Sequence, residues 1–167
     1  MEGASRVRVG IPKGLLYSRY GVAWETLLVS LGHEVVFSPP SNRAIVDSGC
    51  QIAVDETCLS VKVYLGQVAW LAKRADKVLV PRFVSVRPKE RECVKLWAIH
   101  DIARNSLPDA DIIGYSVDSL GLTHRRVRPT QGLYEFAISL GASPLKAAMA
   151  TIKATRAQSK AHRDMII

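Results

Sequence analysis

The sequence predicts an α/β fold, a doubly wound parallel sheet of about four strands with helices on both faces and a helical C-terminal extension. Short β-branched runs alternate with segments of helical periodicity, which is the order of parallel crossover units. The 167 residues are 48% hydrophobic and 23% charged, a balance typical of globular proteins. A chain of this length can bury a core without disulfides or a structural metal.

The first crossover unit covers residues 7–37. Residues 7–11 are a β-branched run that Pro12 ends, and residues 15–31 carry apolar side chains at helical spacing. Gly32 supplies the left-handed position that ends such a helix, and residues 33–37 are a second β-rich run. This strand, helix and strand predict two neighbouring parallel strands.

A third strand follows two more helical segments. Ser41 or Asn42 can cap a short helix over residues 43–48, and residues 59–72 have helical spacing. Residues 77–80 form a nearly continuous apolar run, as expected for a strand that is covered on both faces.

The remaining elements are an extended segment, three helices and a fourth strand. We expect residues 82–86 to be extended, residues 111–115 to form the strand and residues 116–128 to form a loop. The predicted helices cover residues 94–104, 131–140 and 144–163.

These elements group into two parts. We expect residues 1–128 to form a Rossmann-like or flavodoxin-like domain, and residues 129–167 to form a helical extension that leads to a second half absent from this chain. Apolar residues thin out after Pro144, so we expect its last helix to pack loosely on the sheet or to extend from it.

The net charge of +8 favours an acidic partner. From Arg125 to Arg163 the only acidic residue is Glu135, so the excess lies in the tail, where a solvated helix face is the simplest interpretation. No nucleic-acid-binding motif is present, and nucleic acid is not an expected partner. The basic residues of this stretch are Arg125, Arg126, Arg128, Lys146, Lys153, Arg156, Lys160 and Arg163.

No apolar run is long enough to cross a bilayer, and the first residues do not resemble a secretory signal. We therefore expect a cytoplasmic protein without membrane association. Three cysteines make an odd number, which argues against a disulfide framework. Free or metal-bound thiols remain.

Two of the cysteines, Cys58 and Cys93, each follow an extended segment and precede a predicted helix. Exposed amides at a helix start favour the thiolate form, which binds metals and attacks electrophiles. We expect both sulfurs at the carboxyl-end rim of the sheet, facing a shared crevice. Cys50 lies in an apolar stretch and is expected to be a small buried hydrophobe.

The same rim gathers the loops that follow the strands, so Lys13 and Arg82 are candidate contacts for an anion. Neither GxGxxG nor GxxxxGK[ST] is present, so no standard nucleotide loop supports this interpretation. The cysteines lack the close pairs of structural zinc sites, and the four histidines are scattered.

Several strings resemble one family, the 2-hydroxyacyl-CoA (2-hydroxyglutaryl-CoA) dehydratase-related proteins, also described as acyl-CoA dehydratase activase-related. The resemblance covers over half of the chain and is to the amino-terminal half of these proteins. The matching strings are GIPKGLLY (10–17), SPPSN (38–42), AVDETCLSVKV (53–63), GQV (66–68) and VPRFVSV (80–86).

The resemblance implies that Cys58 and Cys93 are ligands of an iron–sulfur cluster, in a domain that serves a CoA-dehydratase electron-transfer system and is not catalytic alone. A 4Fe–4S cluster takes four ligands, usually all thiolates. Either the chain is a fragment, or a second α/β half or another copy completes the site, or the cluster has been lost. An acyl-CoA is the ligand that the resemblance implies.

This chain departs from the family pattern at three places. The family commonly has Pro where Ser60 stands, Pro where Val94 follows the second cysteine, and His where Gln67 stands. A second hypothesis therefore stays open, a cluster-free module that binds a phosphorylated or CoA-type ligand or a partner protein.

Overall fold

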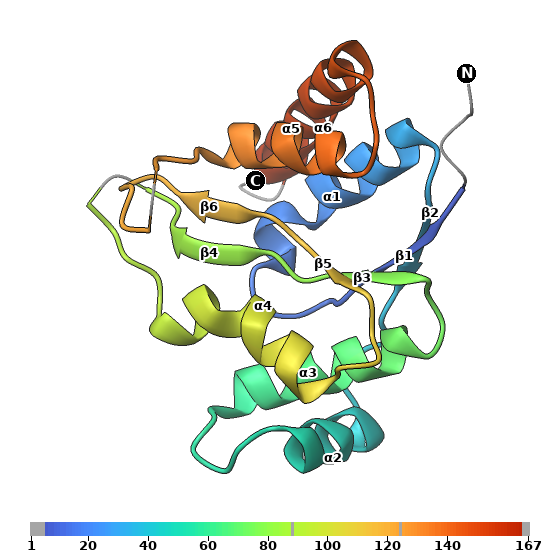
Figure 1. The fold of residues 1–167 in the computed structure, drawn as a ribbon, viewed down its shortest axis with the longest axis vertical. Coiled ribbons are helices and arrows are strands. Elements are labelled where there is room, and N and C mark those ends of the chain that lie inside the picture. Colours follow the sequence, from blue (N-terminus) through green and yellow to red (C-terminus); the bar gives the residue numbers. More distant parts are fainter. Residues whose placement is uncertain (1–5, 88, 124, 165–167) are drawn as a thin grey trace.

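A parallel four-stranded sheet forms the centre of the computed structural model, which describes residues 6–87, 89–123 and 125–164 (Figure 1). Its strand order is β2-β1-β3-β5, and Val9 of β1 pairs with Val35 on one side and Lys77 on the other. The predicted fold class is confirmed. The strands are β1 (Arg8–Ile11), β2 (Glu34–Phe37), β3 (Lys77–Leu79) and β5 (Ile112–Ile113).

Two of these strands continue beyond the sheet as a second parallel pair. After Pro81, β4 (Arg82–Ser85) pairs with β6 (Ser116–Asp118). The amide of Val80 donates to the carbonyl of Ile113 at 2.8 Å, so the pairing passes through the junction. The expected loop over residues 116–128 was therefore wrong at its start, because Val117 is the only apolar side chain in a strand of three residues.

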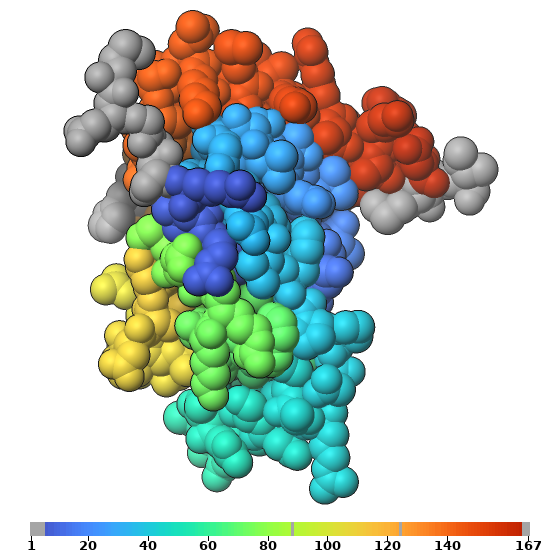
Figure 2. All heavy atoms as spheres, turned by 90° about the vertical axis from the view of Figure 1, so that its right-hand side faces the viewer, coloured from blue at the N-terminus to red at the C-terminus, as the bar shows by residue number. Residues whose placement is uncertain are grey.

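Helices lie on both faces of the sheet (Figures 1 and 2). On one face α1 and α5 contact the strands and α6 packs outside them, and on the opposite face α3 and α4 contact the strands, with α2 outside α3. Each layer has its own cluster of buried side chains. The helices are α1 (Tyr17–Leu31), α2 (Arg43–Ile52), α3 (Leu59–Ala72), α4 (Val94–Ser106), α5 (Pro129–Ser139) and α6 (Pro144–Asp164).

The last helix differs from expectation. It lies along α1 instead of packing loosely on the sheet, because buried Ala147, Ala150 and Ala154 allow a close approach between the two helices. The side chain of Gln158 is buried, and its Oε1 accepts a hydrogen bond of 3.0 Å from the amide of Ala23. The predicted division of the chain at residue 128 stays a prediction.

None of the described helices combines the length and the apolar character that a bilayer crossing requires.

The contact between α2 and α3 depends on two glycines. A Cβ added at Gly49 would lie 1.9 Å from the carbonyl oxygen of Lys62, and one added at Gly66 would lie 2.0 Å from that of Ile45. Real Cβ atoms do not approach backbone atoms this closely, so only glycine permits the observed distance between the helices. The crossing thereby fixes α3, at whose start Cys58 lies.

We expect Gly49→Ala and Gly66→Ala each to lower the free energy of unfolding by about 1–3 kcal/mol, the usual cost of overpacking. The expected loss arises because backbone atoms, not flexible side chains, block the added methyl group. Urea unfolding followed by circular dichroism measures the change.

Cys50→Ala is the matched control, since Cys50 is exposed on α2, next to Gly49. Its stability should stay within about 0.5 kcal/mol of the parent, as for other surface substitutions. Equal stability of the glycine variants and the control would contradict the close-packing explanation.

Candidate functional site

The thiol of Cys58 is exposed at the start of α3, where Cys58 is the N-cap residue. The turn before it is held by two hydrogen bonds. The amide of Thr57 donates to the carbonyl of Val54 at 3.0 Å, and Nζ of Lys62 donates to the carbonyl of Asp55 at 3.0 Å. The local sequence therefore places the sulfur beside the open amides of a helix start.

Cys93 has the same position in α4. It is the N-cap residue of that helix, and its thiol is exposed. The preceding segment is tied to β4, because the amide of Glu92 donates to the carbonyl of Val84 at 3.0 Å. The prediction that both cysteines lie at helix starts is confirmed.

Both helices run in the same layer, beneath the sheet in Figure 1. They pack against each other, and each begins on the side toward which β4 and β6 point. The two thiols thus lie toward one edge of the molecule. Whether they share a crevice stays a prediction.

Large apolar side chains accompany these two thiols at the surface. Leu59 and Val94 directly follow Cys58 and Cys93, and they are 63% and 66% exposed. Val54, just before the Cys58 turn, is also 66% exposed. Exposed apolar groups at a site are typical of a surface that another protein or domain covers.

Cys50 differs from the expectation that it is buried. It lies on α2, whose buried residues Ile45 and Gly49 face α3, and its own side chain is exposed. The apolar stretch around it is one face of a helix, and Cys50 is not on that face. It is therefore a surface thiol on a different helix from the other two.

Lys13 lies in the turn after β1, and its side chain is exposed. Its backbone amide donates to Oγ of Ser38 at 2.8 Å, which ties this turn to the end of β2. Its ammonium group lies 4.8 Å from the centroid of the Phe37 ring. Lys13 is thus an exposed residue at the strand ends, and its anion contact stays a prediction.

Arg82, the other predicted anion contact, is already paired. Its guanidinium Nη2 lies 2.6 Å from Oδ2 of Asp101 on α4. The Nε atom of Arg82 is buried without a hydrogen-bond partner among the described residues. The carboxylate of Asp101 neutralises the positive charge with which Arg82 would attract an anion. The anion role of Arg82 stays a prediction.

Gln67 is a buried polar residue of α3 near the Lys13 turn. Its Nε2 donates to Oγ of Ser41 at 3.3 Å, whereas its Oε1 has no partner among the described residues. A Cβ at Gly14 would lie 2.8 Å from that oxygen. A methyl group at position 14 would therefore displace the end of the Gln67 side chain.

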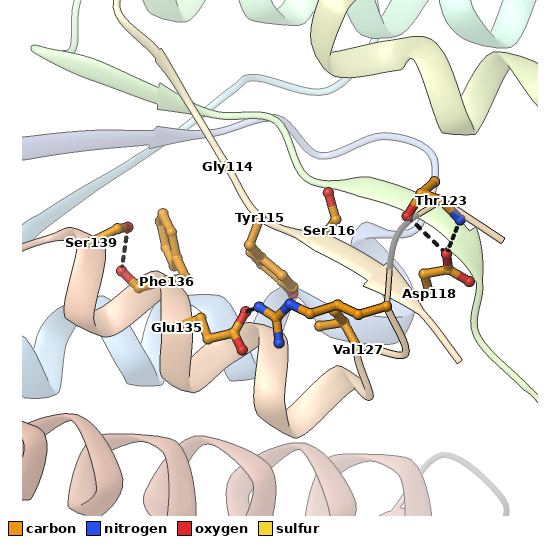
Figure 3. Close-up of a pocket in the computed structure, with 10 residues that line it drawn as sticks. Gly114, Tyr115, Ser116, Asp118, Thr123, Val127, Glu135, Phe136 and Ser139 are labelled. Carbon is orange, nitrogen blue, oxygen red and sulfur yellow. Dashed lines mark hydrogen bonds and ion pairs between the residues drawn. The ribbon is translucent and has the colours of Figure 1, made fainter. Parts of the chain in front are cut away.

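A separate cavity of about 360 Å³ lies between β6 and α5 (Figure 3). Tyr115 and Phe136 contribute aromatic walls, and Arg125 pairs with Glu135 at 2.6 Å. Burial raises the pKa of the Tyr115 hydroxyl, which accepts a hydrogen bond from Nε1 of Trp24 at 2.8 Å. Sequence reasoning missed this cavity because it treated residues 116–128 as a loop.

Asp118 organises the loop beside that cavity. Its carboxylate is fully buried and accepts hydrogen bonds from the amides of Gly121 and Thr123, each at 2.8 Å, and from the Thr123 hydroxyl at 3.0 Å. Burial acts to raise the pKa of Asp118, but the hydrogen bonds from the loop outweigh burial and hold the pKa below its usual range. The carboxylate therefore stays ionised at neutral pH.

Comparison with known proteins gives one match. A family model described as "CoA enzyme activase uncharacterised domain" matches residues 8–166. No curated protein and no solved structure matches the chain. The matched range includes both helix-start cysteines, Lys13 and Arg82.

We expect Asp118→Asn to lower the free energy of unfolding by about 1–3 kcal/mol at neutral pH, because an amide NH₂ group would face donors in a buried site. The parent should also lose stability in acid. An aspartate with a lowered folded pKa stabilises the fold above its unfolded pKa of about 3.9, and this contribution is lost as the pH falls through the folded pKa.

Thermal unfolding of both proteins between neutral pH and about pH 2.5 tests this explanation. The difference between parent and variant should shrink as the pH falls below about 4. A difference that is constant over this range would show that ionisation of Asp118 does not stabilise the loop.

Proposed function

The chain belongs to the CoA enzyme activase domain family, and on that premise we propose that it contributes two iron–sulfur ligands, Cys58 and Cys93, to an acyl-CoA dehydratase system. The observation that carries the proposal is the shared placement of these thiols. Each is exposed at the N-cap of a helix, and the two helices begin toward the same edge. Cysteine thiolates are the usual ligands of iron–sulfur clusters.

This chain does not fit a complete cluster by itself. A 4Fe–4S cluster takes four ligands, of which Cys58 and Cys93 would be two. Within residues 6–87, 89–123 and 125–164, no three His, Cys, Asp or Glu side chains are grouped closely enough to hold a metal ion. The missing thiolates would come from a second α/β half or from a second copy of the chain.

The apolar residues beside the thiols support completion by a second protein surface. Val54, Leu59 and Val94 expose most of their side chains to water in this chain. A covering domain would bury these side chains and limit access of water to the ligands. Limited access of water changes the redox potential of a metal site. The proposed role is thus that of a component, with the dehydratase chemistry completed elsewhere in the assembly.

Anaerobic reconstitution of the full chain with iron and sulfide tests the thiol assignment. A small-molecule thiol in the buffer supplies ligands that the isolated chain lacks. We expect bound iron and sulfide with the visible and EPR spectra of a thiolate cluster, and Cys58→Ser and Cys93→Ser should each remove most of this signal. If two copies share a cluster, about one cluster forms for every two chains, since each brings two of four ligands.

Cys50→Ser is the matched control because it removes an exposed thiol from a different helix. It should bind as much iron as the parent. Equal iron binding by all three variants, or no binding by the parent when the added thiol is present, would overturn the assignment.

A second candidate function is a cluster-free binding module for a phosphorylated or CoA-type ligand. The specific observation in its favour is Lys13, whose exposed ammonium group makes no ion pair with a carboxylate among the described residues. Its turn follows β1, next to the place where the order β2-β1-β3 reverses direction. Ligands of open α/β sheets bind at such a position.

For this candidate we expect the parent to bind CoA. Lys13→Ala should bind CoA at least tenfold more weakly, because it loses the attraction between the ammonium group and the CoA phosphates. Isothermal titration calorimetry measures both affinities. Lys73→Ala is the control, since Lys73 is exposed at the far end of α3. Absence of CoA binding by the parent, or an equal affinity of Lys13→Ala and the parent, would exclude Lys13 as a CoA contact.

A further inference from the structure

The solvent face of α6 carries the large apolar side chains of that helix. Leu145, Met149 and Ile152 are 73%, 64% and 50% exposed, while alanines face α1. Their spacing of four and three residues places them on one face. The usual arrangement of a surface helix, with large apolar residues inward, is reversed here.

A groove lies along this face. It has a volume of about 370 Å³ and is bounded by Ser30 of α1 and by Leu145, Met149, Lys146 and Lys153 of α6. In the space-filling view α6 lies at the surface beside α1 (Figure 2). The groove is therefore lined both by apolar side chains and by two lysines.

Positive charge continues along the helix. The one acidic residue of α6 is Asp164, the last residue of the helix, and the ion pairs among the described residues involve none of the cations of α6. Nζ of Lys146 donates to the carbonyl of Leu31 at 3.0 Å, which holds this ammonium group between the two helices. The other cations are Lys153, Arg156, Lys160 and Arg163.

We propose that the groove between α1 and α6 binds an acidic amphipathic helix of another protein. Such a helix would place apolar side chains in the groove and carboxylates beside Lys153 and Arg156. A second copy of this chain is disfavoured, because two basic α6 surfaces would repel each other. A membrane is disfavoured, because the apolar part covers only about two helical turns and borders a hollow that a side chain can enter.

Fluorescence anisotropy with a synthetic helical peptide of about 15 residues tests this proposal. The probe carries Leu at positions i, i+4 and i+7 and Glu on its other faces, and a second probe has Lys in place of every Glu. We expect the full chain to bind the acidic probe, to bind it less tightly as salt increases, and not to bind the basic probe. Lys153→Glu with Arg156→Glu should weaken binding at least tenfold, and Met149→Glu should do the same.

Lys73→Glu is the control for charge reversal, because Lys73 is exposed on α3 on the other face of the sheet. It should bind the acidic probe like the parent. Hydrogen exchange of the unaltered chain gives an independent measurement, in which the probe should slow exchange in the first half of α6. Sedimentation with phosphatidylserine vesicles tests the membrane alternative. The proposal is overturned by equal binding of both probes, by unchanged affinity in the α6 variants, or by binding to the vesicles without binding to the acidic probe.

Discussion

A cluster of aromatic side chains holds the outer strand pair on the rest of the fold. A pair of two short strands has little stability alone, and β4 and β6 form such a two-stranded sheet, with a single further bridge from Asp118 to Val127 among the described residues. The ring of Phe83 stacks on that of Tyr20 with centroids 5.1 Å apart, and Trp24 donates to the hydroxyl of Tyr115. These contacts fasten both strands to α1, and Cys93 depends on them because the segment before α4 is bonded to Val84 of β4.

Cys58 reaches the same edge by a different physical means. Its helix α3 is positioned by the sheet on one side and by the glycine contact with α2 on the other. The two thiols therefore have separate structural supports, a helix crossing for Cys58 and an aromatic cluster for Cys93. Contacts between α3 and α4 link these two supports, because both helices contribute to the same buried cluster.

The sequence predicted the four central strands because β-branched runs bounded by Pro, Gly and charged residues give a strong local signal. It did not predict β6, since the alternation in Ser116-Val117-Asp118 is too short to distinguish from a loop. The helix-start positions of Cys58 and Cys93 were predictable from their neighbours. The pairing of Arg82 with Asp101 and the cavity beside Tyr115 could not be predicted. Both bring together residues that are distant in the sequence, and no local pattern encodes such contacts.

The distribution of apolar groups argues for a component of an assembly. The interior is closed on both faces of the sheet, so the exposed large residues do not reflect a core that lacks a covering element. Those most exposed include Leu59 and Val94 beside the thiols and Leu145 and Met149 on the basic helix, the two surfaces proposed here to be covered by other molecules. These surfaces lie on opposite faces of the sheet, so the proposed cluster ligands and the proposed helix partner can be bound without competing for space.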